Sequence, residues 1–285
     1  SLERWAKTYP KRDTVFVKGL LKLEENYYHN HPEKYGAYVE EILSLSSQLD
    51  YIKGLSSGYL HKAHKLLRAG DYPSAIQQIF KKIAIDKRAK DQLQEANSYS
   101  MLGYLYSLSG EDLSKATHYY DLALRTAHKL PKDDPDKEIF IINTTINGTT
   151  VLKDPKEEMR SIALLTDALK LLNNSKRHKD RMYFYQKAAL LLNLGDSYAK
   201  VDQQRQSNTY LIEAIEIAER NGLSLALARS HLLIADNAIH LSELTLAKQS
   251  LDYLGELLAE NKLDAEEKLM YSSSMERFHV AKQDY

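Results

Sequence analysis

Residues 99 to 123 carry the pattern that decides the fold: Tyr99-x-x-Leu102-Gly103-x-x-Tyr106, then Gly110, then Ala116-x-x-x-Tyr120-x-x-Ala123. Large residues recur three and four places apart, which is the spacing of one face of an α-helix. The chain shows no alternating apolar and polar pattern of the strand type. The small residues Gly103 and Ala116 predict that two helices approach each other closely at these points.

The same pattern recurs twice more along the chain. One copy reads Leu191-x-x-Leu194-Gly195-x-x-Tyr198, then Ser207-x-x-x-Leu211-x-x-Ala214, and a weaker copy reads His231-x-x-Ile234-Ala235-x-x-Ala238, then Ala247-x-x-x-Leu251. The large residue that follows the small one is called the anchor here. Anchors occur in steps of 40, 41, 45, 46 and 40 residues, at Val39, Ile79, Tyr120, Leu165, Leu211 and Leu251. Such a period indicates a tandem array of similar units.

The pattern resembles that of tetratricopeptide repeats, whose units are pairs of helices. The resemblance implies an all-α fold, a tetratricopeptide-like helical-hairpin solenoid wound as a right-handed superhelix, with about six helix pairs. One array is expected over residues 1–285, with units at roughly 14–50, 51–92, 93–130, 136–180, 181–222 and 223–262 and a half unit at 265–285. Each pair alone would expose an apolar face, so the units are expected to stabilise one another by stacking.

Small residues stand at the predicted close approaches between the helices of a pair. In the second helix they are Ala75, Ala116, Ser161, Ser207 and Ala247, and in the first helix they are Ala63, Gly103, Gly195 and Ala235. Turns are predicted at Gly70-Asp71-Tyr72-Pro73, between the helices of one pair, and at Asn221-Gly222, which ends a helix.

Two segments depart from the pattern. Thr149 stands where Gly or Ala is expected, and a loop-like linker, residues 131–135, precedes that unit. A local irregularity is expected there, and not a domain boundary. Lys282-Gln283-Asp284-Tyr285 aligns with the turn Ala69-Gly70-Asp71-Tyr72, so the helix from about 265 to 282 is expected to be half of an unfinished pair in a fragment of a longer protein. Its apolar residues are expected to leave an uncovered outer face: Leu269, Met270, Met275, Phe278 and Val280.

Composition narrows the function classes. The formal net charge is +0, with 39 basic and 39 acidic residues, so nucleic acid is not an expected partner of this segment. Cysteine is absent, which excludes disulfides, thiolate zinc sites and cysteine nucleophiles. The sequence has no phosphate-binding Gly-rich loop, no nucleophile elbow and no His-Glu-x-x-His motif. We therefore expect no enzyme activity, no cofactor and no metal site.

A narrower resemblance rests on Trp5, Asp13-Thr14-Val15, Leu20-Leu21-x-Leu23, His31-Pro32-Glu33-Lys34 and Leu49-Asp50-Tyr51-Ile52-Lys53-Gly54. These stretches resemble repeat-containing sensor proteins of Bacteroidetes. In that family the array is the N-terminal sensory half, followed by a single membrane helix and a histidine kinase or a LuxR-like DNA-binding output. The resemblance implies a periplasmic segment, with the membrane helix and output domain outside this sequence. The alternative is a cytoplasmic protein.

The functional surface is expected on the first helix of each pair, which lines the concave side of tetratricopeptide arrays. Relative to the Gly or Ala of that helix, inward side chains lie six and three places before and one, four and five places after. For each of these positions, a structural role without a ligand is as good an explanation as a role in binding. The polar residues at these positions are the candidates for binding a ligand or partner: His64, Arg68, Asn97, Ser100, Tyr104, Asn143, Thr150, Asp196, Lys200, Arg229, Asp236 and His240.

The leading functional hypothesis is a scaffold that binds a protein or peptide, or senses a ligand, because helical arrays offer extended concave surfaces. A second hypothesis is a segment that serves only dimerisation and assembly, or a cytosolic adaptor without a small-molecule ligand. A sensing groove predicts clustered polar and aromatic residues, whereas a dimerisation segment predicts a self-complementary apolar patch near one end.

Overall fold

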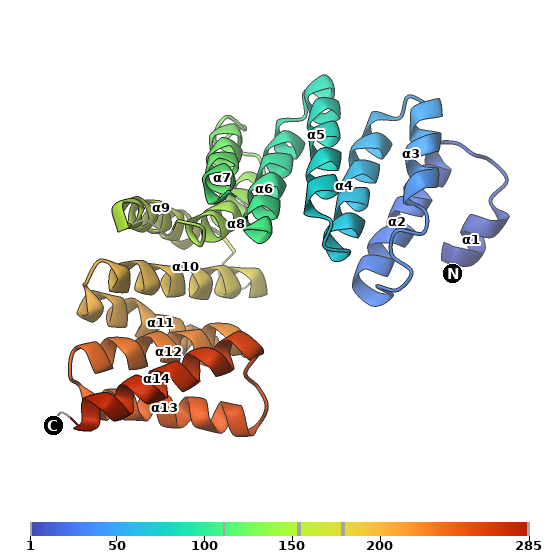
Figure 1. Ribbon diagram of the computed structural model, residues 1–285. Helices are drawn as coiled ribbons and strands as arrows, with labels where there is room; N and C mark the ends of the chain where they lie inside the picture. Colours follow the sequence, from blue (N-terminus) through green and yellow to red (C-terminus); the bar gives the residue numbers. More distant parts are fainter. Residues whose placement is uncertain (1, 111, 153–154, 178–179, 284–285) are drawn as a thin grey trace. The chain divides into compact units, whose positions relative to one another are not determined.

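The computed structural model describes residues 2–110, 112–152, 155–177 and 180–283. These residues form fourteen α-helices and no strand (Figure 1). The helices are α1 (Leu2–Thr8), α2 (Thr14–Asn30), α3 (Val39–Gln48), α4 (Ile52–Arg68), α5 (Tyr72–Ala89), α6 (Gln92–Ser109), α7 (Leu113–His128), α8 (Lys137–Thr149), α9 (Pro155–Asn173), α10 (Arg181–Lys200), α11 (Gln204–Asn221), α12 (Ser224–His240), α13 (Leu244–Ala259) and α14 (Ala265–Gln283). The all-α fold class is confirmed, with six successive pairs from α2 to α13 and α14 after them.

Contacts group the chain into two compact units, residues 1–140 and 141–285, called here the N-terminal and C-terminal units. In the N-terminal unit the most extensive contacts join α4 to α5 and α6 to α7. In the C-terminal unit they join α10 to α11 and α12 to α13. In these four pairs the two helices therefore pack extensively on each other, whereas α3 packs more extensively on α4 than on α2. The organisation of residues 1–285 as one array stays a prediction.

The six anchors form the core between helices. Each anchor is at most 3% exposed, and the small residue four places before it is fully buried in the five units from Ala75 onward. Tyr35, which stands at the small position of the first unit, is 8% exposed. In the first helices, Ala63 and Ala235 are fully buried as well. The repeat register read from the sequence therefore describes the packing of the helices.

Aspartates begin many of the helices. The side chains of Asp13, Asp71, Asp91, Asp112 and Asp180 each accept a hydrogen bond from a backbone N–H of the first turn, in α2, α5, α6, α7 and α10 respectively. Such capping satisfies donors that have no partner within the helix. The two predicted turns are confirmed: Asp71 separates α4 from α5, and Gly222 ends α11 with a φ of +65°.

The repeat pattern does not predict α1, a helix of 7 residues. Its Trp5 ring packs against Phe16 of α2 at a centroid distance of 5.7 Å. Gly19 of α2 leaves the space that the Trp5 ring occupies, since a Cβ at Gly19 would overlap that ring. Aromatic packing therefore holds α1 on the N-terminal unit, and a helix of this length has no sequence period of its own.

α14 completes the C-terminal unit. Asp264 and Glu267 form a capping box, in which each side chain accepts from the other's backbone N–H at 2.8 and 2.9 Å. α14 contacts both α12 and α13, and Phe278 is 8% exposed. Leu269 and Val280 are 73% and 56% exposed. The expected uncovered face is therefore present, but it holds two of the five apolar side chains.

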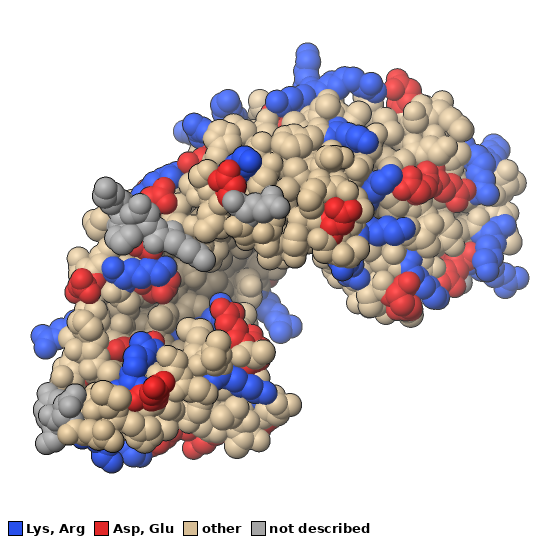
Figure 2. All heavy atoms as spheres, viewed as in Figure 1, with Lys and Arg blue, Asp and Glu red and all other residues tan. Residues whose placement is uncertain are grey.

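Charged side chains of both signs alternate on the surface. In Figure 2, Lys and Arg lie beside Asp and Glu on the face shown of each unit, in keeping with the formal net charge of +0. No helix within the described ranges combines the length and the hydropathy needed to cross a bilayer.

Candidate functional site

A cavity of about 210 Å³ lies in the C-terminal unit. Its walls come from the first helices of successive pairs: Thr149 at the end of α8 and Thr150 after it, Asn193 and Asp196 on α10, Arg229 on α12. α14 closes it with Glu266 and Met270. The cavity thus forms on the helices for which the sequence predicts the functional surface.

Three of the twelve candidate residues line this cavity: Thr150, Asp196 and Arg229. Lys200, one turn after Asp196, pairs with it at 2.8 Å between Nζ and Oδ2. The structure therefore brings together candidates that lie up to 79 positions apart in the sequence. Their role in binding stays a prediction.

Lys200 is shared between two carboxylates. Its Nζ lies 2.8 Å from Oδ2 of Asp196 and 3.2 Å from Oε1 of Glu158, whose side chain is 2% exposed. Burial by itself would lower the pKa of Lys200, but the hydrogen bond from Lys200 to Asp196 and the negative charges of Asp196 and Glu158 raise it overall. Lys200 therefore stays protonated and fixes Asp196 at the cavity wall.

Two ion pairs join α12 to α14 beside the cavity. Arg229 donates to Oε2 of Glu266 at 2.7 Å, and Arg277 donates to Oδ1 of Asp236 at 2.7 Å. Ser274 of α14 also donates to Asp236, at 2.7 Å. Since Arg229 and Asp236 are both candidates, the structure assigns each of them a contact that holds α14 in place.

The two other candidates of the C-terminal unit lie away from the cavity. Asn143 of α8 accepts a hydrogen bond from Gln186 of α10 at 2.8 Å, so it connects two first helices. His240 is exposed at the end of α12.

The candidates of the N-terminal unit form two separate groups. Arg68 lies over the rings of Tyr28 and Tyr35, at 4.5 and 5.0 Å from their centroids, and His64 packs on Tyr28. On α6, Asn97 and Tyr104 are exposed and Ser100 is half-buried. An open hollow of about 590 Å³ lies beside Tyr35, but none of the five candidates of the N-terminal unit lines it.

The aromatic group around Arg68 makes stability depend on pH. Burial lowers the pKa of His61 to about 4, with a smaller effect from His64. As the pH falls, His61 is protonated in the unfolded chain at about pH 6.5, before it is protonated in the folded protein. The contribution of neutral, buried His61 to the free energy of unfolding is therefore complete above about pH 6.5 and is lost as the pH falls towards about 4.

His61→Gln keeps a hydrogen-bonding partner for Tyr35, whose Oη lies 2.9 Å from His61 Nδ1, but removes the titrating group. We expect a smaller loss of stability between about pH 7 and about pH 4.5 in this variant than in the wild type, measured by urea midpoints. The exposed His118→Gln is the control. Equal losses in wild type and His61→Gln would contradict the prediction.

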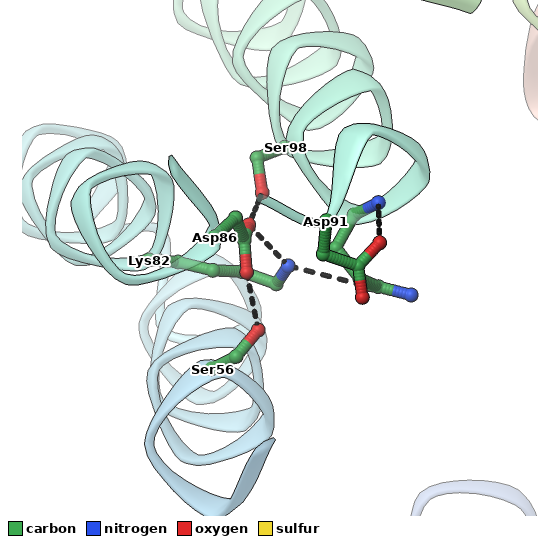
Figure 3. A network of polar contacts seen from close by, with 6 residues as sticks. Ser56, Lys82, Asp86, Asp91 and Ser98 are labelled. Carbon is green, nitrogen blue, oxygen red and sulfur yellow. Dashed lines mark hydrogen bonds and ion pairs between the residues drawn. The ribbon is translucent and has the colours of Figure 1, made fainter. Parts of the chain in front are cut away.

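A buried polar network lies between α4, α5 and α6 of the N-terminal unit (Figure 3). Lys82 and Asp86 of α5 form an ion pair at 2.9 Å with side chains 2% and 1% exposed. Asp86 also accepts from Ser56 at 2.6 Å and from Ser98 at 2.9 Å, which joins α4 and α6 to α5. Burial lowers the pKa of Lys82, and the hydrogen bond to Asp86 opposes that effect. Because its charges are paired inside the core, we assign the network a role in stabilising the fold and no role in binding a ligand.

No group of three or more His, Asp or Glu side chains in the described ranges is arranged to hold a metal ion.

Sequence reasoning missed the apolar wall of the cavity. Leu192 occupies a predicted inward position, three places before Gly195, but the candidate set contains only polar residues and Tyr104. Asn193 and Leu233 lie two places before Gly195 and Ala235, a position outside the rule used. Including that position would have added Asn193, but Leu233 is apolar and would still have been left out of a polar candidate set.

No protein-family model and no curated protein sequence matches the chain. Solved structures do resemble it. The apo form of RapI gives a TM-score of 0.71 at 15% identity, covering 94% of this chain and 72% of that one. BtubC (BKLC) from P. vanneervenii gives 0.64 at 19% identity, covering 78% and 89%. A signal transduction ATPase with numerous domains from Pyrococcus horikoshii, which carries a tetratricopeptide repeat sensor, gives 0.57 at 16% identity, covering 98% and 41%. The chain therefore has the fold of tetratricopeptide-like helical repeat proteins.

Proposed function

We propose that the C-terminal unit binds a short peptide segment of a partner protein in the cavity lined by α8, α10, α12 and α14. The observation that carries this proposal is the cavity itself, which combines an apolar wall with charged and amide side chains. Binding sites in proteins typically have this composition, because apolar contacts give affinity and a few polar groups give orientation. The volume of about 210 Å³ suits one or two side chains of a segment.

A selection from a randomised peptide library tests the site. Peptides selected on the wild type are expected to lose binding to Leu233→Arg, which places a long charged side chain in the cavity. They are expected to keep binding to Leu258→Arg, since Leu258 is 38% exposed on α13 and lies outside the cavity. Retained helical signal confirms that each variant is folded. Equal binding to both variants would place the site elsewhere.

We further propose that this binding serves sensing in bacterial signal transduction, with the chain as the N-terminal sensory part of a periplasmic sensor. Support comes from the resemblance of residues such as Trp5 and His31-Pro32-Glu33-Lys34 to Bacteroidetes sensors, and from the fold of the Pyrococcus protein, whose repeats are named a sensor. Fractionation of cells that express the complete gene tests the location. Recovery in the cytoplasm would favour the adaptor alternative.

Self-association is the second candidate function, because Leu269 and Val280 are exposed on α14. If this face mediates a dimer, Leu269→Glu lowers the sedimentation coefficient measured at high concentration. A monomeric wild type at all concentrations excludes it.

A further inference from the structure

We propose that the cavity of the C-terminal unit binds a positively charged nitrogen carried on an apolar stem, as at the free N-terminus of a peptide or in a lysine side chain. The inference rests on the proposed peptide-binding function and specifies the chemical group that the peptide must carry. Three independent features support it: the charges around the cavity, the hydrogen-bonding groups left free in it, and its apolar wall.

Carboxylates outnumber basic groups around the cavity. Asp196 and Glu158 share the single ammonium of Lys200, and Glu266 pairs with Arg229. Among the described side chains these three carboxylates pair with two basic groups, which leaves an excess of one negative charge. Part of this charge is screened poorly, because the side chain of Glu158 is 2% exposed. A cationic ligand would neutralise the excess.

Three polar side chains of the cavity wall have already used hydrogen-bond donors on the protein itself, whereas Nε of Arg229 is buried without a hydrogen-bond partner. Thr149 and Thr150 donate their hydroxyl protons to backbone carbonyls of α8, at 2.9 and 2.7 Å. Asn193 donates from Nδ2 to the backbone carbonyl of Ile146 at 3.1 Å. What these groups can still offer is largely acceptors: hydroxyl oxygens, the amide oxygen of Asn193 and, in the described ranges, Oδ1 of Asp196. Such a set matches the three N–H donors of an ammonium group.

The remaining wall is apolar. Leu192 of α10, Leu233 of α12 and Met270 of α14 contribute to it. An aliphatic stem can pack on these side chains while its charged end reaches the acceptors, as amphipathic side chains do elsewhere in proteins. Methionine adapts its shape to such a stem.

A carboxylate ligand fits less well, although Arg229 lines the cavity. An incoming carboxylate can accept from the buried, unpartnered Nε of Arg229, but Nη2 of Arg229 is already held by Glu266 at 2.7 Å. It would also add a negative charge where carboxylates are already in excess. The charge balance therefore favours the cation.

Four small probes test the inference by methyl NMR of the wild type: leucinamide, Nα-acetyl-lysinamide, Nα-acetyl-leucinamide and N-acetylleucine. The chain has 5 Met residues, so their methyl signals are readily assigned, and Met159, 61% exposed outside the cavity, serves as the internal reference. We expect a cationic probe to shift the Met270 signal and to bind about tenfold more tightly than the neutral probe, as a charge-assisted hydrogen bond would give. A preference for leucinamide indicates a peptide N-terminus, and a preference for acetyl-lysinamide indicates a lysine side chain.

Asp196→Asn should remove most of the preference for the cationic over the neutral probe, while Lys200 keeps its partner Glu158. The matched control is Asp252→Asn on α13, an exposed carboxylate outside the cavity that pairs with Lys248. Tighter binding of N-acetylleucine, or equal binding of charged and neutral leucinamides, would overturn the charge preference and leave the peptide-binding function standing. If no probe shifts Met270, both proposals fail.

Discussion

Asp86→Ala is expected to destabilise the protein by about 3–5 kcal/mol, because it removes one partner of a buried ion pair and leaves the other charged. Lys82 would retain Gln94, whose Oε1 lies 3.2 Å from its Nζ, and the nearby negative charge of Asp91, but no ion-pair partner. The hydroxyl groups of Ser56 and Ser98 would also lose the acceptor on which they converge (Figure 3). Denaturant midpoints of wild type and variant measure the loss.

Two comparisons separate the effect of burial from that of pairing. Lys248 and Asp252 of α13 have the same spacing as Lys82 and Asp86, at 2.6 Å, but are 64% and 61% exposed. Asp252→Ala is therefore expected to cost less than about 0.5 kcal/mol. The double variant Lys82→Met/Asp86→Leu removes both buried charges and is expected to be more stable than Asp86→Ala. If Asp86→Ala and Asp252→Ala cost the same, the network contributes nothing through its burial.

The sequence contains no signal that distinguishes these two ion pairs. Lys82-x-x-x-Asp86 and Lys248-x-x-x-Asp252 both look like solvated pairs on one helix face. What buries Lys82 is the approach of α4 and α6, and the serines that complete the network lie 30 and 12 positions from Asp86. Residue types and local spacing cannot reveal such a partner, because it depends on how neighbouring pairs stack.

The sequence predicts the fold far more completely than it predicts the cavity. Anchors and small residues recur at nearly constant separation, because the close approach of two helices requires them in every unit. The cavity has no such period. Thr150, Asp196 and Arg229 could be found because the rule for inward positions applies to each first helix. The sequence could not distinguish Leu233 and Met270 from core residues, since both the protein core and the wall of a binding cavity contain apolar side chains.

α14 shows a second limit of sequence reasoning. Its apolar residues predict an uncovered face, but the sequence does not show that the helix would lie against both α12 and α13. The pairs Arg229–Glu266 and Asp236–Arg277 join residues 37 and 41 positions apart. α14 thereby supplies a wall of the cavity, so its attachment and ligand binding in the C-terminal unit depend on the same side chains.

Gly103→Leu and Gly195→Leu are each expected to destabilise the protein by about 3 kcal/mol, through overpacking at a close helix approach. A Cβ at Gly195 would lie 2.5 Å from Cδ2 of Leu211, and a Cβ at Gly103 would lie 2.8 Å from two ring carbons of Tyr120. Both partners are anchors, 0% and 3% exposed, so they have no space into which to move. The second helix of the pair would have to shift away from the first, and contacts along the whole pair would loosen.

Gly255→Leu in α13 is the matched control, since it is also a helix-interior glycine. A Cβ there would approach only the Tyr271 hydroxyl, at 3.2 Å, the far end of a side chain that can rotate away. Replacing a helical glycine by leucine also gains helix propensity, by roughly 0.5–1 kcal/mol, and that gain is common to all three sites. The difference between the urea midpoints of Gly195→Leu and Gly255→Leu therefore isolates the steric term. Coincident midpoints would mean that the glycines do not mark the contact between the two helices, and that the repeat register assigned to the chain is wrong.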